Sequence, residues 1–110
     1  MSNTTETTET TKEANTESTP LQLPSQTTML HAVKLALSED RPILLDYWTG
    51  SGDGTCFIGV RENDEKLLVK NEDEYTSPVN KIYAVDEEYI ITTENSLYIV
   101  NKSIGTKRIA

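Results

Sequence analysis

The stretch YWTGSGDGTCFIGV, residues 47–60, places three glycines and one aspartate between two apolar runs. A glycine-rich loop binds nucleotide phosphates when Lys-Ser or Lys-Thr follows the last glycine and a helix begins behind it. Here Thr55 and Cys56 follow instead, and the next residues alternate as in a strand. A calcium loop needs acids at several alternate positions, whereas this stretch has Asp53 alone. We therefore interpret its glycines as a turn between two strands, because glycine adopts a positive φ without strain.

The sequence offers few residues for nucleophilic or metal chemistry. Cys56 is the only cysteine and His31 the only histidine, so a disulfide within these residues and a multi-cysteine zinc site are excluded. We expect Cys56 to be a small apolar residue of a strand. A catalytic triad would have to be assembled around His31, and no spacing in the chain suggests one. The acidic clusters ENDE, NEDE and DEE fall between predicted strands, as solvated turns do. We expect a protein that is not an enzyme and that binds no cofactor or metal.

The net charge of the 110-residue chain is −8, with 18 acids against 10 lysines and arginines. A chain of this length has room for one modest domain. Proteins that bind double-stranded nucleic acid usually present a basic surface, and the only late basic cluster here is Lys102, Lys107 and Arg108. The charge argues against duplex binding. It favours a basic protein partner, or weak and salt-sensitive binding of single-stranded RNA.

Aromatic side chains are better placed for contacts than the titratable ones. Tyr47 and Trp48 are neighbours on a predicted strand, so they point to opposite faces. The other tyrosines are spread over the later part of the chain: Tyr75, Tyr83, Tyr89 and Tyr98. Most aromatic residues of a small barrel belong to its core, and stacking on single-stranded bases is their alternative use.

The first 28 residues are rich in Thr, Glu, Ser and Asn and have too few apolar side chains to order themselves. We predict a disordered tail over residues 1–28 and a folded domain over residues 29–110, with PLQLP (residues 20–24) as a candidate tether between them. We find no secretory signal, transit peptide or apolar run long enough to cross a membrane. We therefore expect a cytoplasmic protein without a membrane partner, in the host cytoplasm if it is phage-encoded.

Apolar residues recur at helical spacing after the tail: Met29, Leu30, Val33, Ala36 and Leu37. This spacing predicts a short helix with one apolar stripe. Thr27 or Thr28 can cap its start, and Pro42 places its end near residues 38–40. A helix of this length is unstable alone, so we expect the stripe to lie on the rest of the domain.

The remaining sequence has the pattern of short strands separated by turns. Six runs alternate or are rich in branched and aromatic residues: PILLDYW, TCFIGVREN, KLLVKN, VNKIYAV, YIITT and SLYIV. This spacing predicts a mainly β protein, in which the N-terminal α-helix is followed by a small, strongly bent antiparallel barrel of five to six strands. We expect the helix to cover one end of the barrel, because so short a chain gives a thin core.

The same pattern resembles the Sm fold, and bacterial Hfq in particular, over residues 29–85. The run FIGVREND is similar to the family's second strand and turn, with its apolar residue, glycine and aspartate at Phe57, Gly59 and Asp64. The runs LLVKN and YTSPVNKIYAV are similar to the third strand and to the turn before the last strand. An extra hairpin, EEYIITTENSLYIV, follows, so YIITT and LYIV are an alternative pair of last strands. Small proteins of this kind with a low-complexity acidic tail resemble Sm-like proteins of phages.

The resemblance implies a ring. Sm-type domains pair their strand edges around a cyclic homo-oligomer, and the run SLYIV lacks the proline or inward charge that blocks such pairing. The basic and histidine positions of the Hfq uridine pore correspond here to Thr76 and Ser77, which carry no charge. We therefore predict a non-enzymatic Sm-like ring that contacts RNA or another protein through its faces or central pore, with Tyr75, Thr76, Ser77 and Lys81 as the candidate nucleic-acid contacts. The alternative is a phage structural or accessory adaptor that binds a protein partner through its acidic surface.

Overall fold

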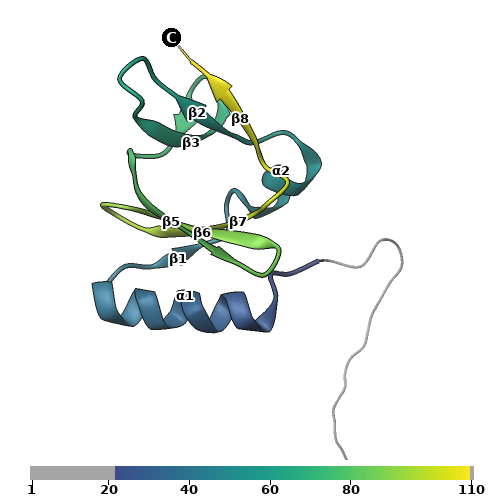
Figure 1. Ribbon diagram of the computed structural model, residues 1–110, viewed down its shortest axis with the longest axis vertical. Helices are drawn as coiled ribbons and strands as arrows, with labels where there is room; N and C mark the ends of the chain where they lie inside the picture. The colour runs from purple at the N-terminus through teal and green to yellow at the C-terminus, as the bar shows by residue number, and fades with distance from the viewer. Residues whose placement is uncertain (1–21, 110) are drawn as a thin grey trace, which may run out of the picture.

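The computed structural model describes residues 22–109, and Figure 1 shows their arrangement. Residues 1–21 of the predicted tail lie outside the described part. The helices are α1 (Gln26–Glu39) and α2 (Trp48–Asp53). The strands are β1 (Ile43–Leu44), β2 (Phe57–Val60), β3 (Lys66–Asn71), β4 (Glu74–Tyr75), β5 (Val79–Val85), β6 (Glu88–Thr93), β7 (Leu97–Asn101) and β8 (Gly105–Arg108). Neither of these two helices is long and apolar enough to cross a membrane.

The strands belong to two sheets. Sheet A has the order β1-β7-β6-β5, and sheet B has the order β4-β3-β2-β8. In Figure 1, α1 covers one face of sheet A and sheet B lies on the other side of it, so the described part has three layers. The hairpins β2–β3, β5–β6 and β6–β7 are antiparallel, whereas β1 runs parallel to β7 and β8 runs parallel to β2. The structure is therefore mainly β with an N-terminal helix, as predicted.

Two features correct the predicted antiparallel barrel of five to six strands. The described residues form eight strands in two sheets without closing a barrel, and two of the strand pairs are parallel. The cause is local: after the two residues of β1 the chain turns into α2, so its next strand starts a second sheet. The run SLYIV, predicted to be a free edge, is β7, which lies between β1 and β6.

Alternate residues of the central strands supply two apolar clusters, one on each face of sheet A. Ile90 and Ile99 pack with Ala32 of α1. Ile91 and Val100 pack in the layer between the two sheets. That cluster is completed by Tyr47, Cys56, Ile58, Leu68 and Ile104. The core of the domain therefore consists of a helix–sheet layer and a sheet–sheet layer.

Polar contacts to the β5–β6 turn fix the start of α1. The N-cap is Ser25, whose hydroxyl oxygen accepts a hydrogen bond from Thr28 N at 3.1 Å. The same hydroxyl donates to Asp86 Oδ2 at 2.6 Å. Thr28, one of the two predicted caps, is instead buried, and its hydroxyl donates to Glu88 Oε1 at 2.6 Å. The helix therefore starts before the predicted domain boundary at residue 29.

α1 ends at Glu39, within the predicted interval, but most of its predicted apolar stripe does not face the sheet. Three residues of the stripe are largely exposed: Leu30 (55%), Val33 (42%) and Leu37 (80%). The helix rests on sheet A through Ala32, with Met29 and Leu35 partly buried beside it. Thr28 lies on this buried face of α1, where its hydroxyl donates a hydrogen bond to Glu88. This hydrogen bond favours the orientation of α1 in which Leu30, Val33 and Leu37 face solvent.

The glycine-rich stretch forms α2 rather than the predicted hairpin turn. Gly54 ends the helix with a φ of 87°, and it is the only glycine of the described residues with a positive φ. Gly50 is buried within α2, where a side chain would overlap the sulfur of Cys56. Trp48 Nε1 donates a hydrogen bond to Gln22 O at 2.9 Å. Gln22 of the predicted tether therefore contacts the domain.

Candidate functional site

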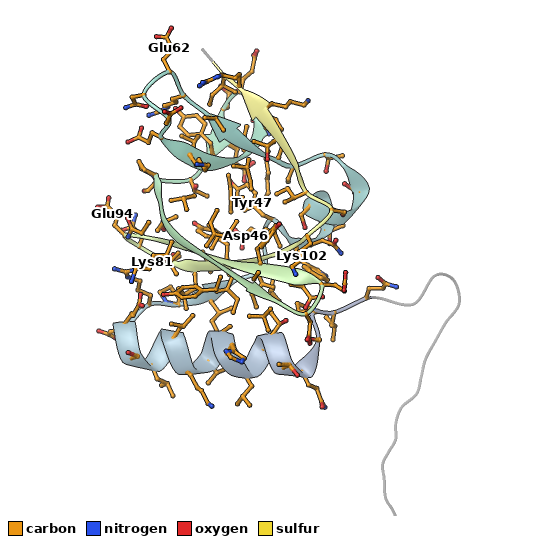
Figure 2. All side chains as sticks on the ribbon, in the orientation of Figure 1. Asp46, Tyr47, Glu62, Lys81, Glu94 and Lys102 are labelled. Carbon is orange, nitrogen blue, oxygen red and sulfur yellow. The ribbon has the colours of Figure 1, made fainter. Side chains whose placement is uncertain are left out.

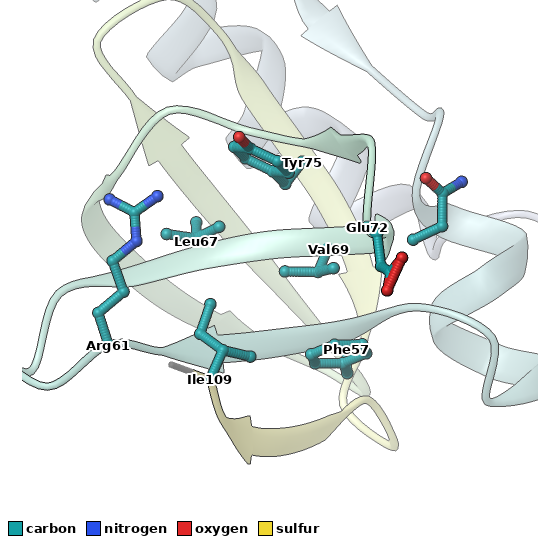
Figure 3. A pocket seen from close by; sticks show the side chains of 8 residues that line it. Phe57, Arg61, Leu67, Val69, Glu72, Tyr75 and Ile109 are labelled. Carbon is teal, nitrogen blue, oxygen red and sulfur yellow. The ribbon is translucent and has the colours of Figure 1, made fainter.

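The face of sheet B that is turned away from sheet A carries a groove of about 600 Å³, called here the sheet B groove. It is lined by Phe57, Arg61, Leu67, Val69, Asn71, Glu72, Tyr75 and Ile109. In Figure 3, Tyr75 lies on one side of Leu67 and Val69, and Ile109 and Phe57 lie on the other side. Concave sites of this size with mainly apolar linings are typical of ligand-binding sites.

The floor of the groove comes from alternate residues of β3. Leu68 belongs to the core between the sheets, so Leu67 and Val69 point to the outer face. An antiparallel sheet with one open face usually carries polar residues on that face. Both floor residues are apolar, and only 2% of Leu67 and 7% of Val69 are exposed. The floor is therefore already covered within this chain, and the large exposed apolar group at the groove is the ring of Tyr75, which is 53% exposed.

Gly59 of β2 makes room for the Ile109 side chain. A Cβ atom at Gly59 would lie 2.8 Å from Ile109 Cδ1 and 3.1 Å from Val69 Cγ2. Ile109 N donates a hydrogen bond to Val60 O at 2.9 Å, which extends the β2–β8 pairing by one residue. Glycine at this position leaves room for Ile109 to pack directly on the backbone of the strand.

Charged side chains surround the apolar part of the groove. At one end, Arg61 Nη1 donates to Glu65 Oε1 at 2.9 Å. Lys107 Nζ lies 4.8 Å from the centroid of the Phe57 ring. Glu72 also lines the groove, and it forms no ion pair with any residue of the described part. The carboxylate of Glu72 therefore favours a cationic group in a bound partner.

The four residues predicted to contact RNA differ in their placement. Tyr75 lines the groove and is 53% exposed. Thr76 is buried, and its hydroxyl accepts a hydrogen bond from Leu68 N at 3.0 Å and donates to Ser77 O at 2.8 Å. Lys81 is exposed on β5 of sheet A, as Figure 2 shows. Of the four, Tyr75 is the one that the structure brings into the groove.

Cys56 and Tyr47 lie in the layer between the sheets, where Figure 2 labels Tyr47. Burial raises the pKa of the Cys56 thiol, which keeps it protonated at neutral pH. Burial, with a smaller contribution from Tyr98, raises the pKa of Tyr47 to about 12. The rings of Tyr47 and Tyr98 meet edge to face with their centroids 5.5 Å apart. Both groups are core residues, and Cys56 is not an activated nucleophile.

Within residues 22–109, no three His, Cys, Asp or Glu side chains are grouped so that they could hold a metal ion. His31 is exposed on α1, and Figure 1 shows sheet A between α1 and sheet B. His31 therefore takes no part in the sheet B groove.

Sequence reasoning missed β8 and Ile109, although Ile109 forms one side of the groove. The run GTKRI, residues 105–109, has a single large apolar residue and no alternation of apolar and polar residues. The available signal was Gly59. A glycine between Ile58 and Val60 inside a strand marks a close approach by another segment.

Comparisons of the chain with protein-family models, with curated proteins and with solved structures find no match. The sheet B groove and the charges around it therefore carry the functional inference.

Proposed function

We propose that this protein is a non-enzymatic binding module that holds a short extended segment of a protein partner in the sheet B groove. The observation that carries this proposal is the apolar floor of Leu67 and Val69 on an outer sheet face, with the exposed ring of Tyr75 beside it. An apolar side chain of the partner fills the groove. This function corresponds to the adaptor alternative drawn from the sequence.

The charge of the chain favours a cationic partner segment. The net charge is −8, and Glu72 lines the groove. The turns on either side of β3 add further acids, among them Glu62, Asp64 and Asp73. Opposite charges accelerate and orient association. A polyanion would be repelled by the same acids.

Selection from a library of random peptides on the full chain tests this proposal. We expect the selected peptides to combine an apolar side chain with lysine or arginine. Their dissociation constants are then measured by calorimetry on Tyr75→Ala and on Leu37→Ala, a control on the exposed face of α1. We expect about tenfold weaker binding to Tyr75→Ala, because truncation of a central aromatic contact costs about 1.4 kcal/mol or more. Equal binding to the two variants would place the peptide outside the groove and overturn the proposal.

Single-stranded RNA is a second candidate ligand, favoured by the rings of Phe57 and Tyr75 in the groove and by the resemblance to Sm-like proteins. Bases stack on such rings, and Arg61 and Lys107 lie near them. In this candidate Tyr75 makes the main contact, because Thr76 is buried. Fluorescence anisotropy with short uridine-rich and adenine-rich RNA at low salt tests it. Saturable binding that Tyr75→Ala removes supports RNA, and the absence of saturable binding rejects it.

We also propose that copies of this chain associate through strand edges, as the Sm-like resemblance implies. Because β7 is internal, the edge strands of sheet A are β1, with two residues, and β5, with seven, so β5 is the longer edge. β5 contains no proline and exposes 41% of Ile82, which favours pairing with another strand, whereas its exposed Lys81 and the register shift between Val79 and Lys81 oppose it. Light scattering on the purified chain tests this proposal. A mass several-fold that of the 12.3 kDa chain supports a ring, and a monomer overturns it.

A further inference from the structure

β8 lies at an edge of sheet B, directly beside the groove. It runs parallel to β2, with Gly105 opposite Phe57 and Arg108 opposite Val60. All four of its residues are exposed, whereas Ile104, just before it, is buried in the core between the sheets. The segment is therefore anchored at Ile104 and then lies on the surface along β2.

The side chains of Lys107 and Ile109 point from this segment to the groove side of sheet B. Lys107 Nζ lies 4.8 Å from the Phe57 ring centroid, a cation–π contact. Ile109 packs on Gly59 and lines the groove. β2 therefore contacts two side chains of this segment that are two residues apart in the sequence, one basic and one aliphatic.

Arg108, between them, contacts the turn that follows β2. Its Nη1 donates a hydrogen bond to Arg61 O at 2.9 Å. Its Nη2 lies 3.6 Å from Asp64 Oδ1, with both side chains largely exposed, so this attraction is weak. The β2 edge therefore accepts a second basic residue immediately before the aliphatic one.

We propose that β8 occupies, within its own chain, the place of the partner segment. A partner strand with two basic residues followed by an aliphatic residue adds parallel to β2 and displaces residues 105–109. The aliphatic side chain takes the position of Ile109 over Gly59, and the first basic side chain takes the position of Lys107 over Phe57. This inference rests on the proposed function and names the chemistry of its partner. Addition of a strand to a sheet edge is a recurrent mode of peptide recognition.

The exposure of β8 makes its displacement feasible. Short edge segments with few buried contacts open at a much smaller free energy than the core does. While it is bound, β8 competes with any partner, because a segment tethered by a short link has an effective concentration of the order of millimolar. A variant that loosens β8 should therefore bind the same peptide more tightly than the unmodified chain does.

The experiment uses the fluorescently labelled peptide GTKRI, which repeats residues 105–109, added to the full chain. We expect Ile109→Ser to bind it about tenfold more tightly than the unmodified chain, because the variant weakens the competing segment and leaves β2 intact. Lys107→Glu, which removes the contact to Phe57, should act in the same direction. Leu37→Ala should bind like the unmodified chain. The peptides GTEEI and GTKRS should not bind.

The outcomes separate this inference from the proposed function. Equal or weaker binding of GTKRI to both Ile109→Ser and Lys107→Glu means that β8 is a fixed part of the groove, and the inference is overturned. If GTKRI binds no variant while library-selected peptides bind in a Tyr75-dependent manner, the inference fails and the proposed function stands. If no peptide binds, both fail. Far-UV circular dichroism checks folding, and where Ile109→Ser does not fold, Lys107→Glu decides the comparison.

Discussion

Replacing Gly59 with alanine would test whether the Ile109 side chain packs on the backbone of β2. The new Cβ would lie 2.8 Å from Ile109 Cδ1 and 3.1 Å from Val69 Cγ2. Carbon atoms pack best at about 3.5–4.0 Å, so at least one of these side chains has to move. Val69 belongs to the buried floor, whereas Ile109 follows an exposed edge strand. We therefore expect Ile109 to leave the groove.

Movement of the Ile109 side chain out of the groove should lower the free energy of unfolding only slightly. Full burial of an isoleucine side chain contributes about 1.5–3 kcal/mol, and Ile109 is only partly buried. Its loss should cost about 1 kcal/mol, and the preference for alanine over glycine within a strand offsets part of it. Urea unfolding should show a free energy lowered by less than about 1 kcal/mol. Native-state hydrogen exchange should show faster exchange at the amides of residues 107–109, because the segment opens more often.

Gly52→Ala is the matched control. A Cβ at Gly52 would meet nothing within 4 Å, and the residue is exposed in α2. We expect a gain of up to about 1 kcal/mol in unfolding free energy, since alanine favours the helix, with unchanged exchange in β8. Unchanged or slower exchange of residues 107–109 in Gly59→Ala would show that Ile109 does not rest on Gly59, and the reasoning would be refuted.

Three other substitutions examine the core. Gly50→Ala should destabilise the chain in urea unfolding by about 1–3 kcal/mol, because its Cβ would overlap the Cys56 sulfur; stability equal to that of the unmodified chain would contradict this. Thr28→Val should cost about 1–3 kcal/mol, because buried Glu88 loses its hydroxyl donor; Thr28→Ser should restore most of it. The pKa of Tyr47 is about 12 in the folded chain against an ordinary value of 10.0. Its contribution to stability is therefore complete below pH 10 and declines as the pH rises towards 12. Tyr47→Phe should flatten that decline in unfolding free energy measured across this range, and an identical decline in the variant would reject the assignment.

Strands whose apolar runs end at acidic turns could be predicted closely. The runs KLLVKN and VNKIYAV coincide with β3 and β5, and YIITT and SLYIV lie within one residue of β6 and β7. In these segments neighbours along the chain decide the conformation, because each strand pairs in a hairpin with a strand adjacent to it in the sequence. The helix α1 was predicted for the same reason, from its local spacing and the proline after it.

Contacts between distant residues explain what could not be predicted. Thr28 and Glu88 are 60 residues apart in the sequence, and their hydrogen bond helps decide which face of α1 is buried. The local spacing of apolar residues in α1 gives no information about this contact. β8 forms because β2 offers it an edge and a glycine, and the run GTKRI has no strand pattern of its own. Of the four predicted RNA contacts, Tyr75 alone lines the groove. The other lining residues come from distant segments, including β2, β3 and the residue after β8, and local sequence does not show that these segments meet.

The two parallel strand pairs have a consequence for how this chain folds. They join Ile43 to Leu97 and Phe57 to Gly105, each pair about fifty residues apart. Loop closure over such distances is slow compared with the formation of hairpins. We expect the β2–β3 and β5–β6–β7 ribbons to form early and the parallel pairs to dock last. In a newly made chain, the edge of β2 would therefore stay unpaired until β8 docks. During that time another extended polypeptide could pair with it.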